Sequence, residues 1–185
     1  MAEQIRRGIA LRLLAASGSL PPERDLARQL GVARATVQKA VAILESEGLV
    51  ERRRGRRGGT FLVEAAAPDG RAPRLIEKLR TTRDEIEEAL AFRLALEPAA
   101  AAGAATAADE RALASIAAAA HSAAAAETDA EFMEHDTEFH LAVARASRNR
   151  FFSEAVEGVR LVLNDALAAL PDSDAWHSWS NEEHA

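Results

Sequence analysis

Residues 20–63 read "LPPERDLARQLGVARATVQKAVAILESEGLVERRRGRRGGTFLV", and their apolar spacing predicts two helices followed by a hairpin. The first helix covers Glu23–Leu30, after a proline that suits a first helical turn and before a glycine that suits a helix C-terminus. After a three-residue turn, the second helix runs from about 34 to 47 and ends at another glycine. Residues 49–63 then predict two short strands joined by a glycine- and arginine-rich tip. An amphipathic helix at Ile5–Leu14 precedes this stretch.

The second helix of this stretch has an apolar and a polar face, as a helix that lies in a DNA groove requires. Val37, Val41 and Leu44 recur at helical spacing and are predicted to face the domain core. The polar residues stand near the helix start, where arginine can read guanine, glutamine suits adenine and threonine can contact a phosphate or a thymine methyl. The arginines of the tip are expected to follow the phosphate backbone or to enter the minor groove. The candidates for DNA contact are Arg34, Thr36, Gln38, Arg56 and Arg57.

The same stretch closely resembles the N-terminal domain of the GntR family of bacterial transcription regulators. The resemblance lies in several separate motifs: leucine-proline-x-glutamate-arginine, glycine-valine-x-arginine-x-threonine-valine, glutamate-glycine-leucine-valine, and a glycine-rich wing. It implies a winged helix-turn-helix domain. By this resemblance, Arg24, Arg34 and Thr36, with Gly58 and Gly59 in the wing, fall on the DNA-contact positions of the family.

Two residues depart from the family pattern. Position 33 is usually serine or threonine, whose oxygen caps the second helix, and Ala33 removes this cap at a cost of about 1 kcal/mol of helix stability. Gln38 stands where many members have arginine, so the base preferred at that position is expected to differ. The segment between the first two helices is also shorter than usual for the family.

The composition separates a basic front from an acidic back. Residues 1–65 carry a net charge of +5 and residues 66–185 one of −11, within a total of −6. We therefore expect polyanion contact at the front alone. Hydrophobic residues make up 48% of the chain, inflated by alanine, and this composition favours packed helices over a β-sandwich. The absence of cysteine excludes disulfides and thiolate zinc sites, and no apolar stretch near the start suits a signal peptide or a membrane span, which predicts a cytoplasmic protein.

The predicted fold class is mainly α, with two domains. A winged helix-turn-helix domain covers residues 1–65, a linker containing proline and glycine covers 66–73, and an antiparallel α-helical bundle covers 74–185. Alanine-rich runs in the bundle are read as helix, because alanine is the best helix former. The bundle helices are expected at about 74–79, 82–106, 108–126, 129–147 and 149–169, with another starting near 180.

The bundle resembles the all-helical ligand domain (FCD type) of the FadR-like branch of the GntR family, through "ALAFRLALEP", "EHDTEFHLAVARASRN" and "NEEHA". In that branch an aspartate and three histidines often hold a divalent metal, and a small organic acid binds beside it. The resemblance implies metal ligands at Asp136, His140 and His184 and an effector-facing arginine at Arg93, which could otherwise be an exposed helix arginine. It also implies one or two further helices and a third histidine after Ala185, so we expect this chain to hold an incomplete domain.

Asp136 and His140 stand four residues apart, which places them on one face of a helix. A carboxylate and imidazoles suit Zn²⁺, Ni²⁺ or Mn²⁺, and an effector carboxylate can fill the open coordination positions. A hydrogen bond between the two side chains, without any metal, is the alternative interpretation of the pair. Because at most three protein ligands are available, we expect metal binding in this chain to be weak or absent.

These features predict a transcription regulator that binds double-stranded operator DNA as a homodimer and responds to a small carboxylate effector. Two half-sites related by the two-fold symmetry of the dimer would supply the affinity that one small domain lacks. A helical domain that only dimerises is the second hypothesis. The third is a metal-dependent enzyme in which Asp136 and His140 hold a metal that activates water. We expect no enzyme, because no general base or nucleophile stands beside the pair.

Overall fold

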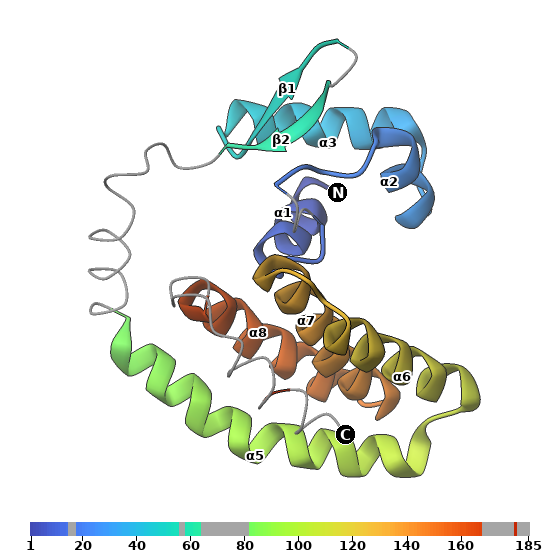
Figure 1. Ribbon diagram of the computed structural model, residues 1–185, viewed down its shortest axis with the longest axis vertical. Coiled ribbons are helices and arrows are strands. Elements are labelled where there is room, and N and C mark those ends of the chain that lie inside the picture. Colours follow the sequence, from blue (N-terminus) through green and yellow to red (C-terminus); the bar gives the residue numbers. More distant parts are fainter. Residues whose placement is uncertain (15–17, 56–57, 64–81, 168–179, 181–185) are drawn as a thin grey trace. The chain divides into compact units, whose positions relative to one another are not determined.

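The computed structural model describes residues 1–14, 18–55, 58–63, 82–167 and 180. The chain divides into two compact units, Met1–Arg71 and Ala72–Ala185 (Figure 1). The predicted linker at 66–73 lies outside the described residues, so its bounds stay a prediction.

The first unit is a winged helix-turn-helix domain, as predicted. Its helices are α1 (Ala2–Ala10), α2 (Glu23–Gln29) and α3 (Arg34–Ser46). The bounds predicted for the N-terminal helix, Ile5–Leu14, were wrong: α1 ends at Ala10, and Arg12 takes a left-handed backbone with a φ angle of 61° that a right-handed helix cannot contain. After these helices in the sequence, β1 (Val50–Arg53) and β2 (Gly59–Leu62) pair antiparallel, from Val50 opposite Leu62 to Arg53 opposite Gly59. The two strands form the wing that the glycine- and arginine-rich sequence predicts.

Glycines end both helices of the helix-turn-helix. Gly31 and Gly48 follow α2 and α3 with φ angles of 65° and 73°, in the left-handed region that side chains other than glycine rarely adopt. The amide of Val32 donates to the carbonyl of Ala27 at 3.0 Å, the bond that closes a Schellman motif at the end of α2. At its start, α3 has Ala33 at the N-cap position and no side-chain cap, which confirms the predicted loss of the capping oxygen.

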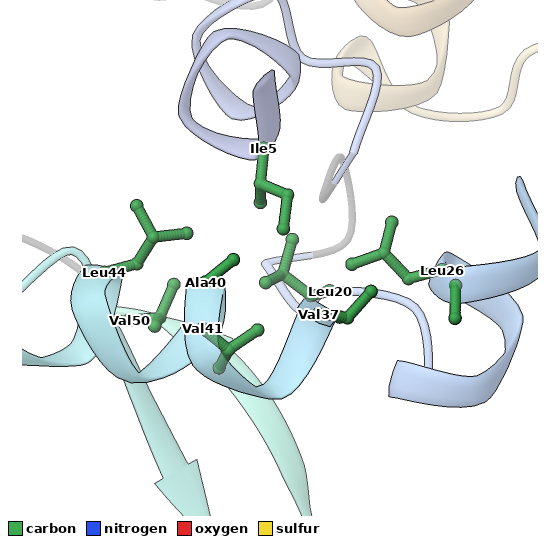
Figure 2. Close-up of a cluster of buried hydrophobic side chains, with 9 residues drawn as sticks. Ile5, Leu20, Leu26, Val37, Ala40, Val41, Leu44 and Val50 are labelled. Carbon is green, nitrogen blue, oxygen red and sulfur yellow. The ribbon is translucent and has the colours of Figure 1, made fainter. Parts of the chain in front are cut away.

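The core of the first unit lies between α1, α2, α3 and the wing, as Figure 2 shows. Val37, Val41 and Leu44 of α3 are fully buried, which confirms their predicted inward orientation. Ile5 of α1 and Val50 of β1 pack against them in the same cluster. Burial of this inner face fixes the rotation of α3 about its axis and leaves its polar face toward solvent.

The second unit consists, in its described part, of four helices with short connections: α5 (Arg83–Ala107), α6 (Glu110–Ala124), α7 (Asp129–Ala146) and α8 (Arg150–Leu167). The predicted helices for these segments agree with the observed bounds within two residues. The α7 helix packs against α5, α6 and α8. The helices expected at 74–79 and from near 180 fall outside the described residues, apart from Ser180 itself.

Small residues and side-chain caps shape this unit. A Cβ at Gly103 of α5 would stand 3.1 Å from the Cβ of Ser147, so glycine lets α5 approach the end of α7 closely. The side chain of Thr128 accepts a hydrogen bond from the amide of Glu131 and so caps α7. Asp109 caps α6 in the same way through the amide of Ala112. That bond, and the nearby positive charge of Arg148, hold the pKa of Asp109 below its usual value.

Within the described ranges, no helix is long and apolar enough to span a membrane.

Candidate DNA interface and buried polar cluster

The predicted base readers of α3 lie on its exposed face. Arg34, Thr36 and Gln38 are all exposed near the start of the helix, and the Arg34 side chain retains 64% of its accessible surface. Arg24 of α2 is more exposed still, at 82%. The structure thus presents all four side chains to solvent, where DNA could reach them.

A carboxylate of α2 contacts two of these side chains. One oxygen of Glu23, Oε2, accepts from Arg34 Nε at 3.2 Å, from Arg34 Nη2 at 3.1 Å and from Gln38 Nε2 at 2.9 Å. Sequence reasoning missed Glu23, because it precedes Arg34 by 11 residues and belongs to another helix. Only the packing of α2 on α3 brings the three side chains together.

The turn of the wing requires glycine at position 58. A Cβ at Gly58 would stand 2.5 Å from the carbonyl oxygen of Arg53 and 2.8 Å from that of Gly55, so no other residue fits this turn without a shift of the backbone. A Cβ at Gly59 would meet only the ring of Phe61, at 3.4 Å. The predicted backbone contacts Arg56 and Arg57 lie outside the described residues.

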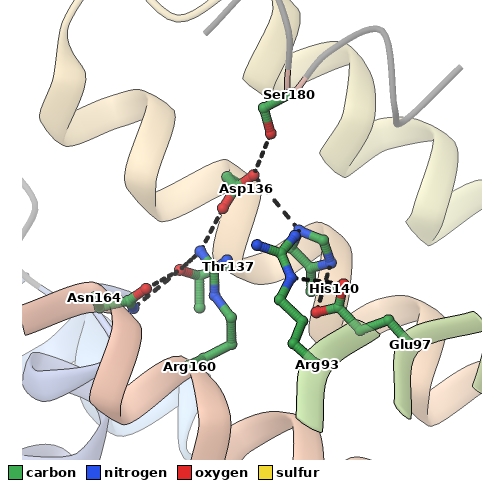
Figure 3. A network of polar contacts seen from close by, with 8 residues as sticks. All are labelled: Arg93, Glu97, Asp136, Thr137, His140, Arg160, Asn164 and Ser180. Carbon is green, nitrogen blue, oxygen red and sulfur yellow. Dashed lines mark hydrogen bonds and ion pairs between the residues drawn. The ribbon is translucent and has the colours of Figure 1, made fainter. Parts of the chain in front are cut away.

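In the second unit, Asp136 and His140 lie side by side in the interior. Both are on α7, and they retain 1% and 8% of their surface. His140 Nε2 lies 3.6 Å from Asp136 Oδ1, and that oxygen also accepts from Ser180 Oγ at 3.0 Å. They belong to a polar cluster of 8 residues (Figure 3): Arg93, Glu97, Asp136, Thr137, His140, Arg160, Asn164 and Ser180.

The cation that faces Asp136 is an arginine of α8. Arg160 is fully buried, and its Nη2 donates to Asp136 Oδ2 and, at 3.0 Å, to Thr137 Oγ1. Asn164 Nδ2 donates to the same hydroxyl at 3.1 Å. Among the described residues, Arg160 Nε has no hydrogen-bond partner. A signal for Arg160 existed in the sequence, since it interrupts the apolar stripe formed by Val156, Val159 and Leu163 at helical spacing.

The predicted effector residue, Arg93, belongs to the same cluster. Its Nε donates to Glu97 Oε2 at 2.8 Å, and its Nη2 lies 3.2 Å from His140 Nε2. Because a guanidinium cannot accept a hydrogen bond, His140 Nε2 must be the acceptor. The other ring nitrogen, His140 Nδ1, lies 3.2 Å from Glu97 Oε1. Sequence reasoning did not include Glu97, although its spacing of four residues from Arg93 was visible.

These contacts test whether the polar cluster suits a metal ion. No three His, Cys, Asp or Glu side chains stand in a metal-binding arrangement within the described part of the chain. The oxygens of Asp136 face Arg160 and Ser180, and Nε2 of His140 faces Arg93. Two guanidinium groups already balance the carboxylates of Asp136 and Glu97. The described residues therefore do not fit a metal as they stand. His184 lies outside them, so the three-ligand set stays a prediction.

Comparison with known proteins assigns both units. The family of "Bacterial regulatory proteins, gntR family" matches residues 1–62, and the FCD domain family matches residues 85–185. The chain belongs to the GntR family, in its FCD branch. The family and two relatives of the chain are described as transcriptional regulators, in agreement with the sequence prediction.

Individual relatives agree with this assignment. The chain is 32% identical over 171 residues to the "Putative L-lactate dehydrogenase operon regulatory protein" of Escherichia coli. This alignment covers 90% of this chain and 65% of that protein. The chain is 30% identical over 147 residues to the "Uxu operon transcriptional regulator" of the same organism, over 73% of this chain and 52% of the relative. The chain thus spans less than two thirds of either protein. Among solved structures, Escherichia coli McbR/YncC has the same fold, with a TM-score of 0.50 over 99% of this chain and 80% of that one, at 17% identity.

Proposed function

We propose that this GntR-family regulator binds a two-fold symmetric operator as a homodimer and that a small carboxylate, bound at the polar cluster, changes its affinity for DNA. The DNA part is supported by the polar face of α3, where Arg34, Thr36 and Gln38 are exposed while the opposite face is buried. The dimer follows from the small size of the reading surface, since one winged domain contacts only a half-site.

The effector part is carried by the buried guanidinium groups. Within the described part of the chain, nothing accepts a hydrogen bond from the Nε–H of Arg160, and an unpaired buried donor is unfavourable unless a ligand or water satisfies it. Arg93 is held by the internal carboxylate of Glu97. A guanidinium binds any carboxylate in the same forked geometry, so an effector carboxylate can take the place of Glu97 on Arg93. Such an exchange would release Glu97 and alter the contacts of α5 with α7.

Metal dependence is a separate question from carboxylate binding. The proposed site needs no metal, because Arg93 supplies the positive charge that a carboxylate requires once the effector has replaced Glu97 on it. If His184 completed a site, a bound metal would have to displace Arg160 from Asp136 and Arg93 from His140. We therefore expect protein that has been dialysed against a chelator to retain its response to the effector.

The test begins with selection of a binding sequence from random duplexes, followed by titration of the selected duplex at fixed salt. Arg34→Ala should weaken binding to that duplex by about 1–3 kcal/mol while thermal unfolding is unchanged, because Arg34 is exposed. Unchanged affinity would contradict the assignment of α3 as the reading helix. Light scattering of the free and DNA-bound protein measures the predicted dimer, and a monomer on a single half-site would contradict it.

The effector test is a titration of small hydroxy and dicarboxylic acids against the protein–duplex complex. L-lactate belongs in this panel, because one relative is named as the putative regulatory protein of an L-lactate dehydrogenase operon. Arg93→Ala should retain duplex binding and lose the response to the active acid. The matched control is Arg83→Ala, which breaks an exposed ion pair with Glu87 on the same helix and should keep the response. If no acid has an effect, the second hypothesis, a helical domain that only dimerises, accounts better for the protein.

A further inference from the structure

Glu23 joins two of the three predicted base-reading side chains of α3, Arg34 and Gln38. A single oxygen of its carboxylate accepts two hydrogen bonds from Arg34 and one from Gln38, at 2.9 to 3.2 Å. The Glu23 side chain is the more buried partner, with 21% of its surface exposed against 64% for Arg34. The carboxylate thus comes from the packed side of the contact, and the arginine projects from it into solvent.

The geometry leaves the reading edge of Arg34 free. A guanidinium has five N–H donors, and Glu23 engages the edge formed by Nε and Nη2. The end formed by Nη1 and Nη2 still offers two parallel donors, which is the arrangement that guanine O6 and N7 accept. An exposed arginine otherwise samples many rotamers, and ordering it upon binding lowers affinity. Holding one edge orients the other before DNA arrives.

Gln38 keeps its reading groups in the same way. Its amide nitrogen has two N–H donors, and Glu23 accepts from that nitrogen once. The second N–H and the amide oxygen remain for the N7 and N6 groups of adenine. The contact also fixes which end of the amide is the donor, since a carboxylate oxygen can only accept. One carboxylate thereby sets the orientation of two neighbouring reading groups.

We propose that Glu23 is a specificity-determining residue of this regulator: a positioning residue that pre-orients Arg34 and Gln38 and couples the base preferences at the two positions they contact. The proposal rests on the operator binding proposed above. The negative charge of Glu23 also lies beside the DNA-reading surface. There it repels phosphates unless the guanidinium of Arg34 neutralises it. Glu23 therefore favours the matched duplex and disfavours non-specific DNA.

The experiment compares Glu23→Gln with Asp25→Asn. Both variants remove one negative charge from α2, but Asp25 pairs with Arg28 and Arg24, whereas Glu23 pairs with Arg34. Base preferences are measured by selection from random duplexes with wild-type protein and with each variant. The base positions read by Arg34 are those at which Arg34→Ala loses its preference, and Gln38→Ala identifies the others.

For Glu23→Gln we expect the discrimination between matched and substituted bases to fall roughly tenfold at both positions, within the range of one bidentate contact. Affinity for a non-operator duplex should stay the same or rise, because a repulsive charge has been removed. Asp25→Asn should keep both preferences. In the Arg34→Ala background, Glu23→Gln should further reduce only the preference read by Gln38, a result that loss of folding cannot mimic.

Two results would overturn the proposal. One is a Glu23→Gln variant that selects bases as sharply as wild type at both positions, which would mean that the ion pair opens upon binding and has no influence on reading. The other is an equal loss of affinity for all duplexes, which would indicate a purely structural role. If the wild-type protein selected no sequence at all, the proposed operator binding would itself fail, and the two failures are distinguished by that first selection.

Discussion

The ion pair between Asp136 and Arg160 leads to a quantitative prediction about the second unit. Arg160 is fully buried and Asp136 is 1% exposed, so Asp136→Asn leaves a guanidinium in the interior without its counter-charge. Removing one partner of a buried pair typically destabilises a protein by about 3–5 kcal/mol. Many domains have a total stability of about 5–15 kcal/mol, so the loss is a large part of the whole.

Urea unfolding followed by circular dichroism measures this loss. With an m-value of about 2 kcal/mol per M, the transition of the second unit should shift to lower urea by about 1.5–2.5 M. The control is Glu87→Gln, which breaks the exposed pair with Arg83 on α5 and should leave the transition unchanged. Dialysis against a chelator should also leave it unchanged, because Arg160 supplies the positive charge beside Asp136.

A double variant, Asp136→Leu with Arg160→Met, distinguishes the cost of an unpaired buried charge from the loss of the other contacts in the cluster. With neither charge left in the interior, most of the lost stability should return. A loss for Asp136→Asn as small as that of the control would refute the reasoning, since it would show that Arg160 reaches solvent or another anion. Destabilisation by the chelator in wild-type protein would instead show that a metal holds the site together.

Three further outcomes are expected. Neutralising Arg56 and Arg57 should weaken binding to every duplex alike and lower the log–log salt slope by about 0.9 for each lost phosphate contact, whereas a loss for one sequence only would make them base readers. Gly58→Ala should speed amide exchange in the wing, because its Cβ would stand 2.5 Å from a carbonyl oxygen, while Gly59→Ala should not. Burial raises the pKa of Glu134, so the protonated side chain stabilises the fold and this stability is lost as pH rises through the folded-state pKa. Glu134→Gln should therefore raise the melting temperature at neutral pH. The same variant should have no effect well below pH 4.5, where Glu134 is protonated in both states.

The sequence alone determined the fold of the first unit and the positions of α2, α3 and α5 to α8 within about two residues. The apolar spacing of Val37, Val41 and Leu44 predicted which face of α3 is buried, because a helix repeats its faces at a fixed local period. The glycines that follow α2 and α3 marked the helix ends, because the left-handed backbone there disfavours other residues. The spacing of Asp136 and His140 likewise placed both on one face of α7. Each of these inferences depends on neighbours within a few residues of one another.

Only the tertiary structure decided which groups surround those residues. Arg160 reaches Asp136 from 24 positions along the chain, and Glu23 reaches Arg34 from 11. No local period relates such partners, because they lie on different helices whose packing follows from the whole core. The metal that the sequence indicated beside Asp136 stays a prediction, and only the structure shows that the guanidinium of Arg160 faces the same carboxylate. An arginine that interrupts an apolar stripe is unfavourable in isolation, and it becomes compatible with burial only when folding supplies the carboxylate that faces it.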